Sequence, residues 1–393
     1  MNKLKEVLQR LRPEFNKGGK YEKFRSTFDA LDTFLFVPGH TTHGGTHIKD
    51  GIDLKRTMFM VVISMIPALL FGIWNVGYQH FRALGIESTL LENMIEGSIV
   101  VLPIVAVSYM VGLGIEFAFA QIRGHQVNEG FLVTGMLIPL CLPPSIPLWM
   151  VGVATAFTVV VCKEVFGGTG MNLLNPALTA RVFLFFAYPA YMAGEYLSNG
   201  DFLWVSANRS EAIEGFSGAT SLSLYGEKKA PVASLWEMFV GLEQGSIGET
   251  SVLAILIGAL ILIITGIGSW RIIVSVFVGG FVMGLILNAI NAGLPIKEQS
   301  IYMAANPLSH LLMGGFAFGA VYMATDPVSA AQTNLGKIYY GFLIGVFTVM
   351  LRVWNPAYPE GMMLAILFMN VLAPLVDYFV IESNKKRRLA RVK

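Results

Sequence analysis

The chain has 393 residues, of which 54% are hydrophobic and only 14% are charged. An ordinary soluble domain carries about 25% charged residues, so this composition excludes that class and indicates a polytopic membrane protein. The net charge of +2 argues against binding to nucleic acid. The two cysteines, Cys141 and Cys162, argue against a disulfide framework, a zinc site and an iron–sulfur cluster held by this chain alone.

Ten apolar segments follow a charged N-terminal tail, which spans residues 1–56 and holds eleven Lys and Arg residues. The tail has no apolar core of the kind found in a cleavable signal peptide. A helix needs about 20 residues to cross the hydrocarbon, and several segments are shorter or broken by Pro and Gly. We therefore expect an all-α polytopic protein of about ten transmembrane helices. The predicted spans are 57–78, 96–120, 129–142, 146–164, 177–193, 250–267, 270–293, 308–325, 338–354 and 361–381.

The charges of the two tails predict the orientation. Lys and Arg are concentrated in the N-terminal tail and in the basic tail of residues 382–393. The positive-inside rule places both in the cytoplasm, which requires an even number of spans. Five spans precede the polar loop of residues 194–249, so this loop is expected on the outer side. It holds eight Asp and Glu against three Lys and Arg, which agrees with that side.

An internal repeat appears at an offset of about 180 residues. Leu132-Val133-Thr134-Gly135 matches Leu312-Met313-Gly314-Gly315, and Asn175-Pro176-Ala177 matches Asn355-Pro356-Ala357. The alternative is chance similarity between apolar helices. With five spans in each copy, residues 57–193 and 250–381 are predicted to be inverted repeats, a transporter-type architecture with sites at the repeat interface.

Two helices of these repeats are expected to be interrupted. The breaks should fall between Ile138 and Pro144 and at Thr325-Asp326-Pro327, with the freed backbone groups buried in protein.

The outer loop contains Glu214-Gly215-Phe216-Ser217-Gly218-Ala219-Thr220. The segment is small and turn-prone, and no nucleophilic triad surrounds it, so Thr220 is interpreted as an attachment point or as part of a plain surface turn. The segment resembles the flavinylation signature, in which a flavin transferase esterifies the last threonine to the phosphate of FMN. Ser217, Gly218 and Ala219 would belong to the FMN site. Gly218 and Ala219 would let the transferase approach the backbone, and Thr220 would supply the ester oxygen. Glu214 stands where the signature usually has Asp.

Nearly the whole chain resembles the B subunits of bacterial sodium-translocating NADH:quinone oxidoreductases. Four segments carry the resemblance: residues 48–56 (IKDGIDLKR), 127–131 (VNEGF), 163–170 (KEVFGGTG) and 355–363 (NPAYPEGMM). It implies one subunit of a six-subunit redox pump in the bacterial inner membrane, with covalent FMN, non-covalent riboflavin, a quinone site and part of a sodium path. The alternatives are the homologous D subunit of the ferredoxin:NAD oxidoreductase (Rnf) complex and a channel or transporter without redox chemistry.

Asn172 and Asn175 follow a Gly-Gly-Thr-Gly loop at the predicted cytoplasmic end of the fourth span. Their amides suit the polar edge of an isoalloxazine, although Asn175-Pro176 also suits a helix N-terminus. The resemblance implies that riboflavin binds here.

Ionisable groups inside spans are functional by default, and three are acidic: Glu116, Asp326 and Asp377. Sodium prefers oxygen ligands such as carboxylates and freed carbonyls. The resemblance links these acids to the sodium path; the alternative is structural pairing with Arg181, Arg352 or partner subunits. Glu164 and Glu360, at span ends, are weaker candidates.

The resemblance also suggests a quinone pocket near Phe183 and Phe185 and near Gly112, although lipid-facing or core packing explains such residues as well. His40, His43 and His47 match no standard metal site, so an ordered cytoplasmic segment near the quinone site is favoured over a metal site.

Overall fold

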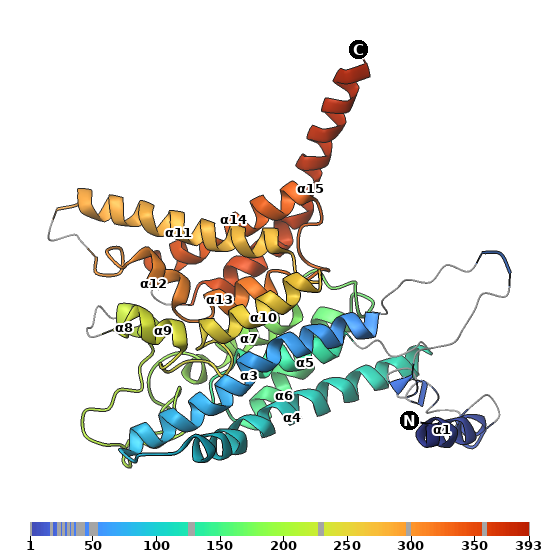
Figure 1. The fold of residues 1–393 in the computed structure, drawn as a ribbon, viewed down its shortest axis with the longest axis horizontal. Helices are drawn as coiled ribbons and strands as arrows, with labels where there is room; N and C mark the ends of the chain where they lie inside the picture. The colour runs from blue at the N-terminus through green and yellow to red at the C-terminus, as the bar shows by residue number, and fades with distance from the viewer. Residues whose placement is uncertain are drawn as a thin grey trace.

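The computed structural model describes residues 54–124, 130–226, 232–295, 300–355 and 360–392, together with helix α1 (Asn2–Phe15) and scattered residues up to 46. These residues form helices joined by loops, with only two isolated β-bridges (Figure 1). Five helices are long and apolar enough to cross a membrane, and three shorter apolar helices accompany them. The prediction of an all-α polytopic membrane protein is confirmed.

Each of the ten predicted spans contains a helix. The first half comprises α3 (Leu54–Leu84), α4 (Leu90–Arg123), α5 (Phe131–Leu140), α6 (Leu148–Phe157) continued by the π-helix η2 (Thr158–Glu164), and α7 (Pro176–Ala187), which the short η3 (Pro189–Tyr191) follows. The second half comprises α10 (Val252–Ile264), α11 (Trp270–Gly293), α12 (Pro307–Leu312), α13 (Phe316–Phe318), the π-helix η5 (Gly319–Met323), α14 (Asn334–Trp354) and α15 (Met362–Val392). Between the halves lie α8 (Ser221–Gly226) and α9 (Leu235–Val240).

Three helices are longer than the sequence predicts. α3, α4 and α15 have 31, 34 and 31 residues. At 1.5 Å per residue each exceeds about 45 Å, so each extends beyond a hydrocarbon core of about 30 Å. α15 runs on through the basic segment 382–392, which the charge pattern predicts as a separate tail.

The break between α5 and α6 falls where the prolines predict it, and its backbone is paired by a distant segment. The amide of Ile247 donates to the carbonyl of Leu142 at 3.1 Å, and the amide of Gly248 donates to the carbonyl of Leu140 at 2.7 Å. Carbonyls freed inside a membrane protein must be satisfied within the protein. The segment between α9 and α10 therefore completes the first half. The second predicted break is also present, since η5 ends at Met323, just before Thr325-Asp326-Pro327.

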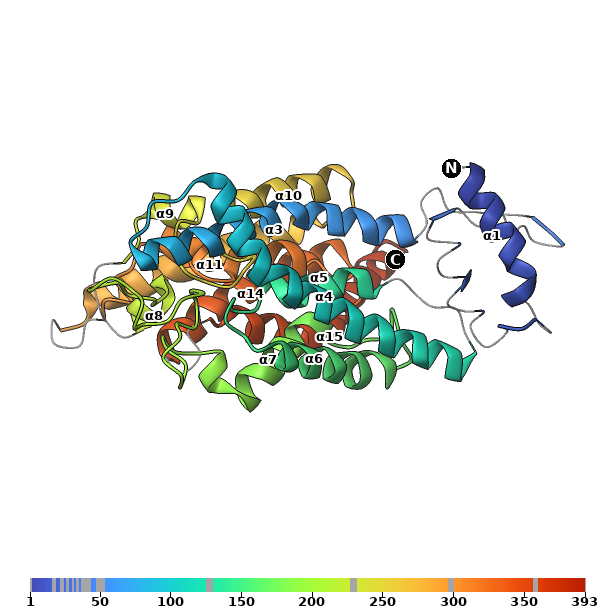
Figure 2. The same cartoon turned by 90° about the horizontal axis from the view of Figure 1, so that it is seen from below.

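Corresponding helices of the two halves contact each other: α3 packs on α10, and α7 packs on α15. In both views α3 and α10 run in opposite directions, as do α4 and α11 (Figures 1 and 2). Thr158 in η2 donates to the carbonyl of Pro176 at the start of α7. Thr348 in α14 similarly donates to Met362 at the start of α15, with 3.1 Å between Oγ1 and Sδ. These relations are those expected of an inverted repeat.

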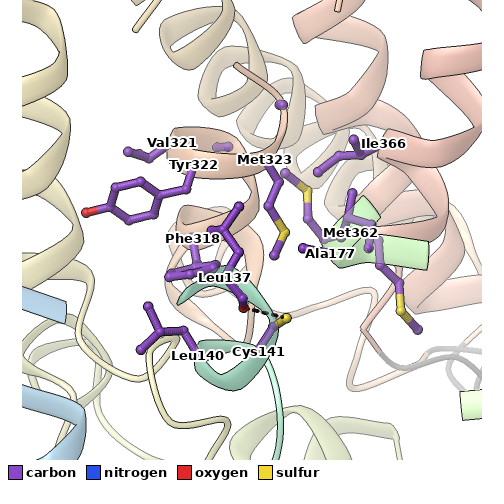
Figure 3. Close-up of a cluster of buried hydrophobic side chains, with 14 of the residues drawn as sticks. Leu137, Leu140, Cys141, Ala177, Phe318, Val321, Tyr322, Met323, Met362 and Ile366 are labelled. Atoms are coloured by element: carbon purple, nitrogen blue, oxygen red, sulfur yellow. Dashed lines mark hydrogen bonds between the residues drawn. The ribbon is translucent and has the colours of Figure 1, made fainter. Parts of the chain in front are cut away.

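The core lies where the broken helices of the two halves meet. Leu137, Leu140 and Cys141 from the end of α5 face Phe318 and Tyr322 from the second half (Figure 3). The Tyr322 hydroxyl donates to the carbonyl of Ser64 in α3 at 2.8 Å. Both interrupted helices are thus held inside protein and not against lipid.

The chain termini lie toward one end of the molecule, and the segment that carries α8 and α9 lies at the other (Figure 2). This is the arrangement that the positive-inside argument predicts for residues 194–249.

Candidate functional site

Thr220 immediately precedes α8 and is half-buried. Its hydroxyl oxygen accepts a hydrogen bond from the amide of Ser223 at 3.2 Å, as an N-cap residue does. The Glu195 carboxylate accepts hydrogen bonds from the amide of Gly218 at 3.1 Å and from the hydroxyl of Ser217 at 3.2 Å. The Gln244 amide donates to the carbonyl of Ser217 at 3.3 Å. The motif is therefore a fixed loop that presents Thr220 at the start of a helix.

The structure corrects one expectation about this loop. Gly218 is buried and does not offer its backbone to an approaching enzyme. A Cβ built on Gly218 would collide with the Phe202 ring. Ser217 is exposed and Ala219 is half-buried, so access to Thr220 comes from the side of the loop away from Phe202.

A cavity opens beside Thr220 and encloses about 590 Å³ of empty space, part of it open to solvent. Thr220, Ser221, Glu243 and Phe185 are among its lining residues. Glu243 accepts a hydrogen bond from the Ser221 hydroxyl. Burial raises the pKa of Glu243 to about 7, and the Ser221 hydrogen bond only partly offsets this effect. The cavity thus combines the Thr220 hydroxyl with a carboxyl group whose pKa is raised to about 7.

The inner wall of this cavity contains an ionic cluster. The Arg181 guanidinium of α7 pairs with both Glu249 and Glu360, and it donates to the Ser246 hydroxyl at 3.1 Å. Arg352 donates from Nε to the carbonyl of Glu360 at 3.0 Å and from a terminal nitrogen to the carbonyl of Met313 at 2.9 Å. The described ion pairs of Arg181 are with Glu249 and Glu360, and Glu116 pairs with Lys163.

A second pocket lies between the two halves of the chain and encloses about 840 Å³ of empty space, part of it open to solvent. Asn172, Asn175, Lys163 and Asp326 line it, together with apolar residues from α3, α5 and α10. Small-molecule pockets combine apolar walls with a few polar groups, and the lining of this pocket has that composition.

The interpretation of Asn175 as a helix N-cap is confirmed. Its side-chain oxygen accepts from the amides of Ala177 at 3.0 Å and Leu178 at 3.3 Å, which makes it the N-cap of α7. Its side-chain nitrogen points across the halves and donates to the carbonyl of Met323 at 3.4 Å. The Asn172 amide donates to the carbonyl of Leu174 at 3.0 Å. The Asn pair thus shapes one wall of the second pocket.

The three acids named from the sequence occupy different surroundings. Asp326 lines the second pocket, and its carboxylate accepts from the Ser329 hydroxyl at 2.6 Å. Glu116 pairs with Lys163, and both side chains are buried. Asp377 accepts from the backbone amides of Gln332 at 2.7 Å and Thr333 at 2.9 Å, ahead of α14. Asp326 and Lys163, the partner of Glu116, thus line the same pocket, whereas Asp377 shapes the loop before α14.

The residues named for quinone binding have different surroundings. A Cβ on Gly112 would collide with the Phe131 ring, so aromatic packing already covers that glycine. Phe183 stacks on Phe157 with ring centres 4.4 Å apart, and Phe185 lies at the cavity beside Thr220. His40, His43 and His47 lie outside the described residues. Among the described residues no group of three His, Cys, Asp or Glu side chains could hold a metal ion.

Lys163 and Glu243 are site residues that reasoning from the sequence missed. Lys163 falls inside the predicted span 146–164, so the rule that ionisable groups within spans are functional would have identified it. The residues next to Glu243 in the sequence do not indicate that it is buried, because its burial depends on how the outer loop folds.

Comparison with known proteins agrees with this architecture. Residues 41–386 match the model of the NQR2, RnfD, RnfE family. Relatives named as the B subunit of the Na(+)-translocating NADH-quinone reductase include those of Ectopseudomonas mendocina, at 48% identity, and Stutzerimonas stutzeri, at 47%, each aligned over 99% of both chains. A relative from Chromohalobacter salexigens has the same name. It is 45% identical to this chain, and the alignment covers 99% of this chain and 96% of the relative. The resemblance found in the sequence is thus confirmed over nearly the full length, and the chain belongs to the NQR2, RnfD, RnfE family as a relative of the B subunits of these reductases.

Proposed function

We propose that this chain is the membrane subunit of a redox-driven sodium pump, carrying covalent FMN on Thr220 and riboflavin beside Asn172 and Asn175. When bound, the two flavins would accept and donate electrons on the way to quinone. The relatives' shared name describes a sodium-translocating NADH-quinone reductase with several subunits. We therefore infer partner subunits in the bacterial inner membrane and a flavin transferase that modifies the outer loop.

The observation that carries the proposal is that Thr220 and the Asn pair line two different pockets, each with apolar walls and a few polar groups. Thr220 opens on one cavity, in the segment opposite the chain termini, and the Asn pair lines the other pocket between the halves. Glu195 and Gln244 hold the Thr220 loop in place. Ionic and amide side chains fix the walls of both spaces, so each holds a ligand in a defined position.

The sodium ion is the cargo of the proposed reaction. Asp326 follows the interrupted helix η5 and lines the pocket, where carboxylate and carbonyl oxygens suit sodium. Glu116 joins the path through Lys163. Asp377 contributes as a positioning residue, because it holds Gln332, whose side chain donates to the carbonyl of Pro327 at 2.7 Å.

The proposal is tested by covalent flavin fluorescence. The chain is co-expressed with its flavin transferase, denatured, separated by electrophoresis and examined for fluorescence under ultraviolet light. Wild type should fluoresce and Thr220→Val should not. Thr265→Val is the matched control, because the Thr265 hydroxyl only donates to carbonyls of its own helix at 2.8 and 3.2 Å.

A dark wild-type band would remove the redox proposal and favour a channel or transporter. If the band fluoresces but the assembled complex passes electrons from ferredoxin to NAD and not from NADH to quinone, the chain belongs with the D subunits of the ferredoxin:NAD oxidoreductase complexes.

A further inference from the structure

Lys163 is a buried cation that pairs with the Glu116 carboxylate and lines the second pocket. It lies in η2, a π-helical turn, and its side chain is 4% exposed. π-Helical turns inside α-helices are rare and frequent at functional sites. Its ammonium pairs with Glu116 of α4, whose side chain is 5% exposed. The neighbouring residue Glu164 pairs with Arg123 of the same helix at 3.0 Å, so two ion pairs join η2 to α4.

Lys163 pairs with Glu116 and also lines the second pocket. Lys163 lines the pocket together with Asp326, and these two are the charged residues among its described lining. Glu116 is not among the lining residues, so a cation in the pocket meets Lys163 before it meets this carboxylate. The ammonium also lies 5.9 Å from the centre of the Phe131 ring, whose other contacts include Gly112.

We propose that Lys163 is a tethered competitor of sodium for the Glu116 carboxylate. The inference rests on the proposed function, in which Glu116 belongs to the sodium path. A carboxylate buried as deeply as Glu116 is costly without a counter-charge, and Lys163 supplies one when no ion is present. A sodium ion that binds Glu116 displaces the ammonium toward the pocket, where Asp326 supplies a second carboxylate.

The charges balance in both arrangements. Lys163, Glu116 and Asp326 together carry one negative charge, which a single sodium ion neutralises. A monovalent cation therefore suits this group of three, and a divalent cation leaves an excess positive charge in a buried site. Lys163 thus acts as a specificity-determining residue as well as a competitor.

The structural alternative is that Lys163 only fastens η2 to α4. Arg123 offers the matched control, because Arg123→Met breaks the neighbouring ion pair between the same two elements and leaves Lys163 in place. A purely structural role predicts similar effects of removing either pair. Competition predicts that only Lys163 changes the response to sodium.

The experiment uses the assembled complex and two independent readouts. Initial rates of quinone reduction are measured against sodium concentration, and binding of radioactive sodium to the purified complex is measured directly. Lys163→Gln keeps a hydrogen-bond donor for Glu116 but removes the competing charge. We expect it to lower the half-saturating sodium concentration by at least roughly tenfold, since losing a charged competitor at short range is worth more than the 1.4 kcal/mol that corresponds to that factor.

Four further outcomes define the test. In Lys163→Gln the maximal rate should fall, because sodium leaves the site more slowly. Calcium should become an inhibitor of this variant. Lys163→Arg keeps a competitor with more donors and should raise the half-saturating concentration, whereas Arg123→Met should leave it unchanged. An unchanged or higher value in Lys163→Gln overturns the inference, and so does a shift in Lys163→Arg toward tighter sodium binding.

Glu116→Gln separates this inference from the proposed function. If it leaves the sodium dependence unchanged, Glu116 is not on the sodium path and the proposed path itself fails. If Glu116→Gln weakens sodium binding while Lys163→Gln has no effect, only the competitor is wrong.

Discussion

Phe202 explains why position 218 of the outer loop is a glycine. The Phe202 side chain is fully buried and its ring fills the space where a Cβ of residue 218 would lie. The same ring packs edge-on against Phe216, with centres 5.4 Å apart. Phe202 therefore packs against one side of the loop, whereas Ser217 is exposed and Thr220 is half-buried.

Gly218→Ala should consequently reduce covalent flavin at Thr220. The added methyl group must displace Phe202 or the loop, and overpacking of this kind typically costs about 1–3 kcal/mol. The measurement is flavin fluorescence per amount of chain on a denaturing gel. Gly226→Ala, where a Cβ would meet nothing within 4 Å, should behave as wild type. Adding Phe202→Leu to Gly218→Ala should restore part of the signal, and full labelling of Gly218→Ala alone would contradict the argument.

Local patterns at single residues could be predicted from the sequence, and distant partners could not. The Asn-Pro pair at 175 and 176 is a helix start whose cap is confirmed. The partners of Arg181 lie 68 and 179 residues away along the chain. Nothing local to Arg181 distinguishes Glu249 and Glu360 from the other acids, because the choice depends on which loops close over α7.

Helices α11 and α14 approach closely through glycines. A Cβ on Gly279 would collide with the carbonyl of Phe342, and a Cβ on Gly345 would collide with the carbonyl of Val276. Small residues let helix backbones approach in membranes, where lipid offers no hydrophobic drive for association. This contact joins the second and fourth helices of the second half.

Gly345→Leu should therefore separate α11 from α14 and destabilise the chain. We expect a lower midpoint temperature of aggregation in detergent, followed by fluorescence-detected size exclusion. Gly114→Leu on α4 is the control, because a Cβ at Gly114 meets nothing within 4 Å. Equal loss of monodisperse protein in both variants would show that any leucine in a span is harmful and would refute the specific contact.

The sequence predicted the helical segments and their interruptions better than the residues at which each helix begins and ends. Hydropathy and proline positions located ten helical segments and the two predicted interruptions. They did not predict the π-helical turns η2 and η5 or the additional break at Gly314-Gly315, since these depend on packing between halves. Asn306-Pro307 at the start of α12 is another Asn-Pro helix cap, whereas Asn355, which the sequence repeat pairs with Asn175, is the C-cap of α14.

The arrangement of the whole molecule makes a topology experiment straightforward. Cys141 and Cys162 are both buried, so the wild-type chain should react slowly with a maleimide. Ser210→Cys in the outer loop should react with a membrane-impermeant maleimide on intact spheroplasts, because Ser210 is exposed. Asn384→Cys, exposed near the end of α15, should react only after the membrane is opened. Labelling of both positions from one side would contradict an even number of spans with an outer loop.

The sequence predicts that Thr220 and the Asn pair lie toward opposite sides of the membrane, because orientation follows from the basic tails. It did not predict the pocket that joins Asn172, Lys163 and Asp326, since these belong to different halves and meet only through their packing. Gly112, Phe183 and Phe185 are apolar or small residues, and composition alone cannot distinguish core packing from a ligand wall.

The pairing of Ile247 and Gly248 with the break after α5 has a consequence for biosynthesis. The carbonyls of Leu140 and Leu142 obtain these partners only after about a hundred further residues have been made. Until then they lie in an interrupted helix inside the bilayer, so the first five helices cannot reach their final packing as a unit. A chain divided after residue 193 would leave the first fragment without Ile247 and Gly248, whereas division just before α10 would keep both with it. The loop that presents Thr220 thus belongs, in the order of assembly, to the half that precedes it.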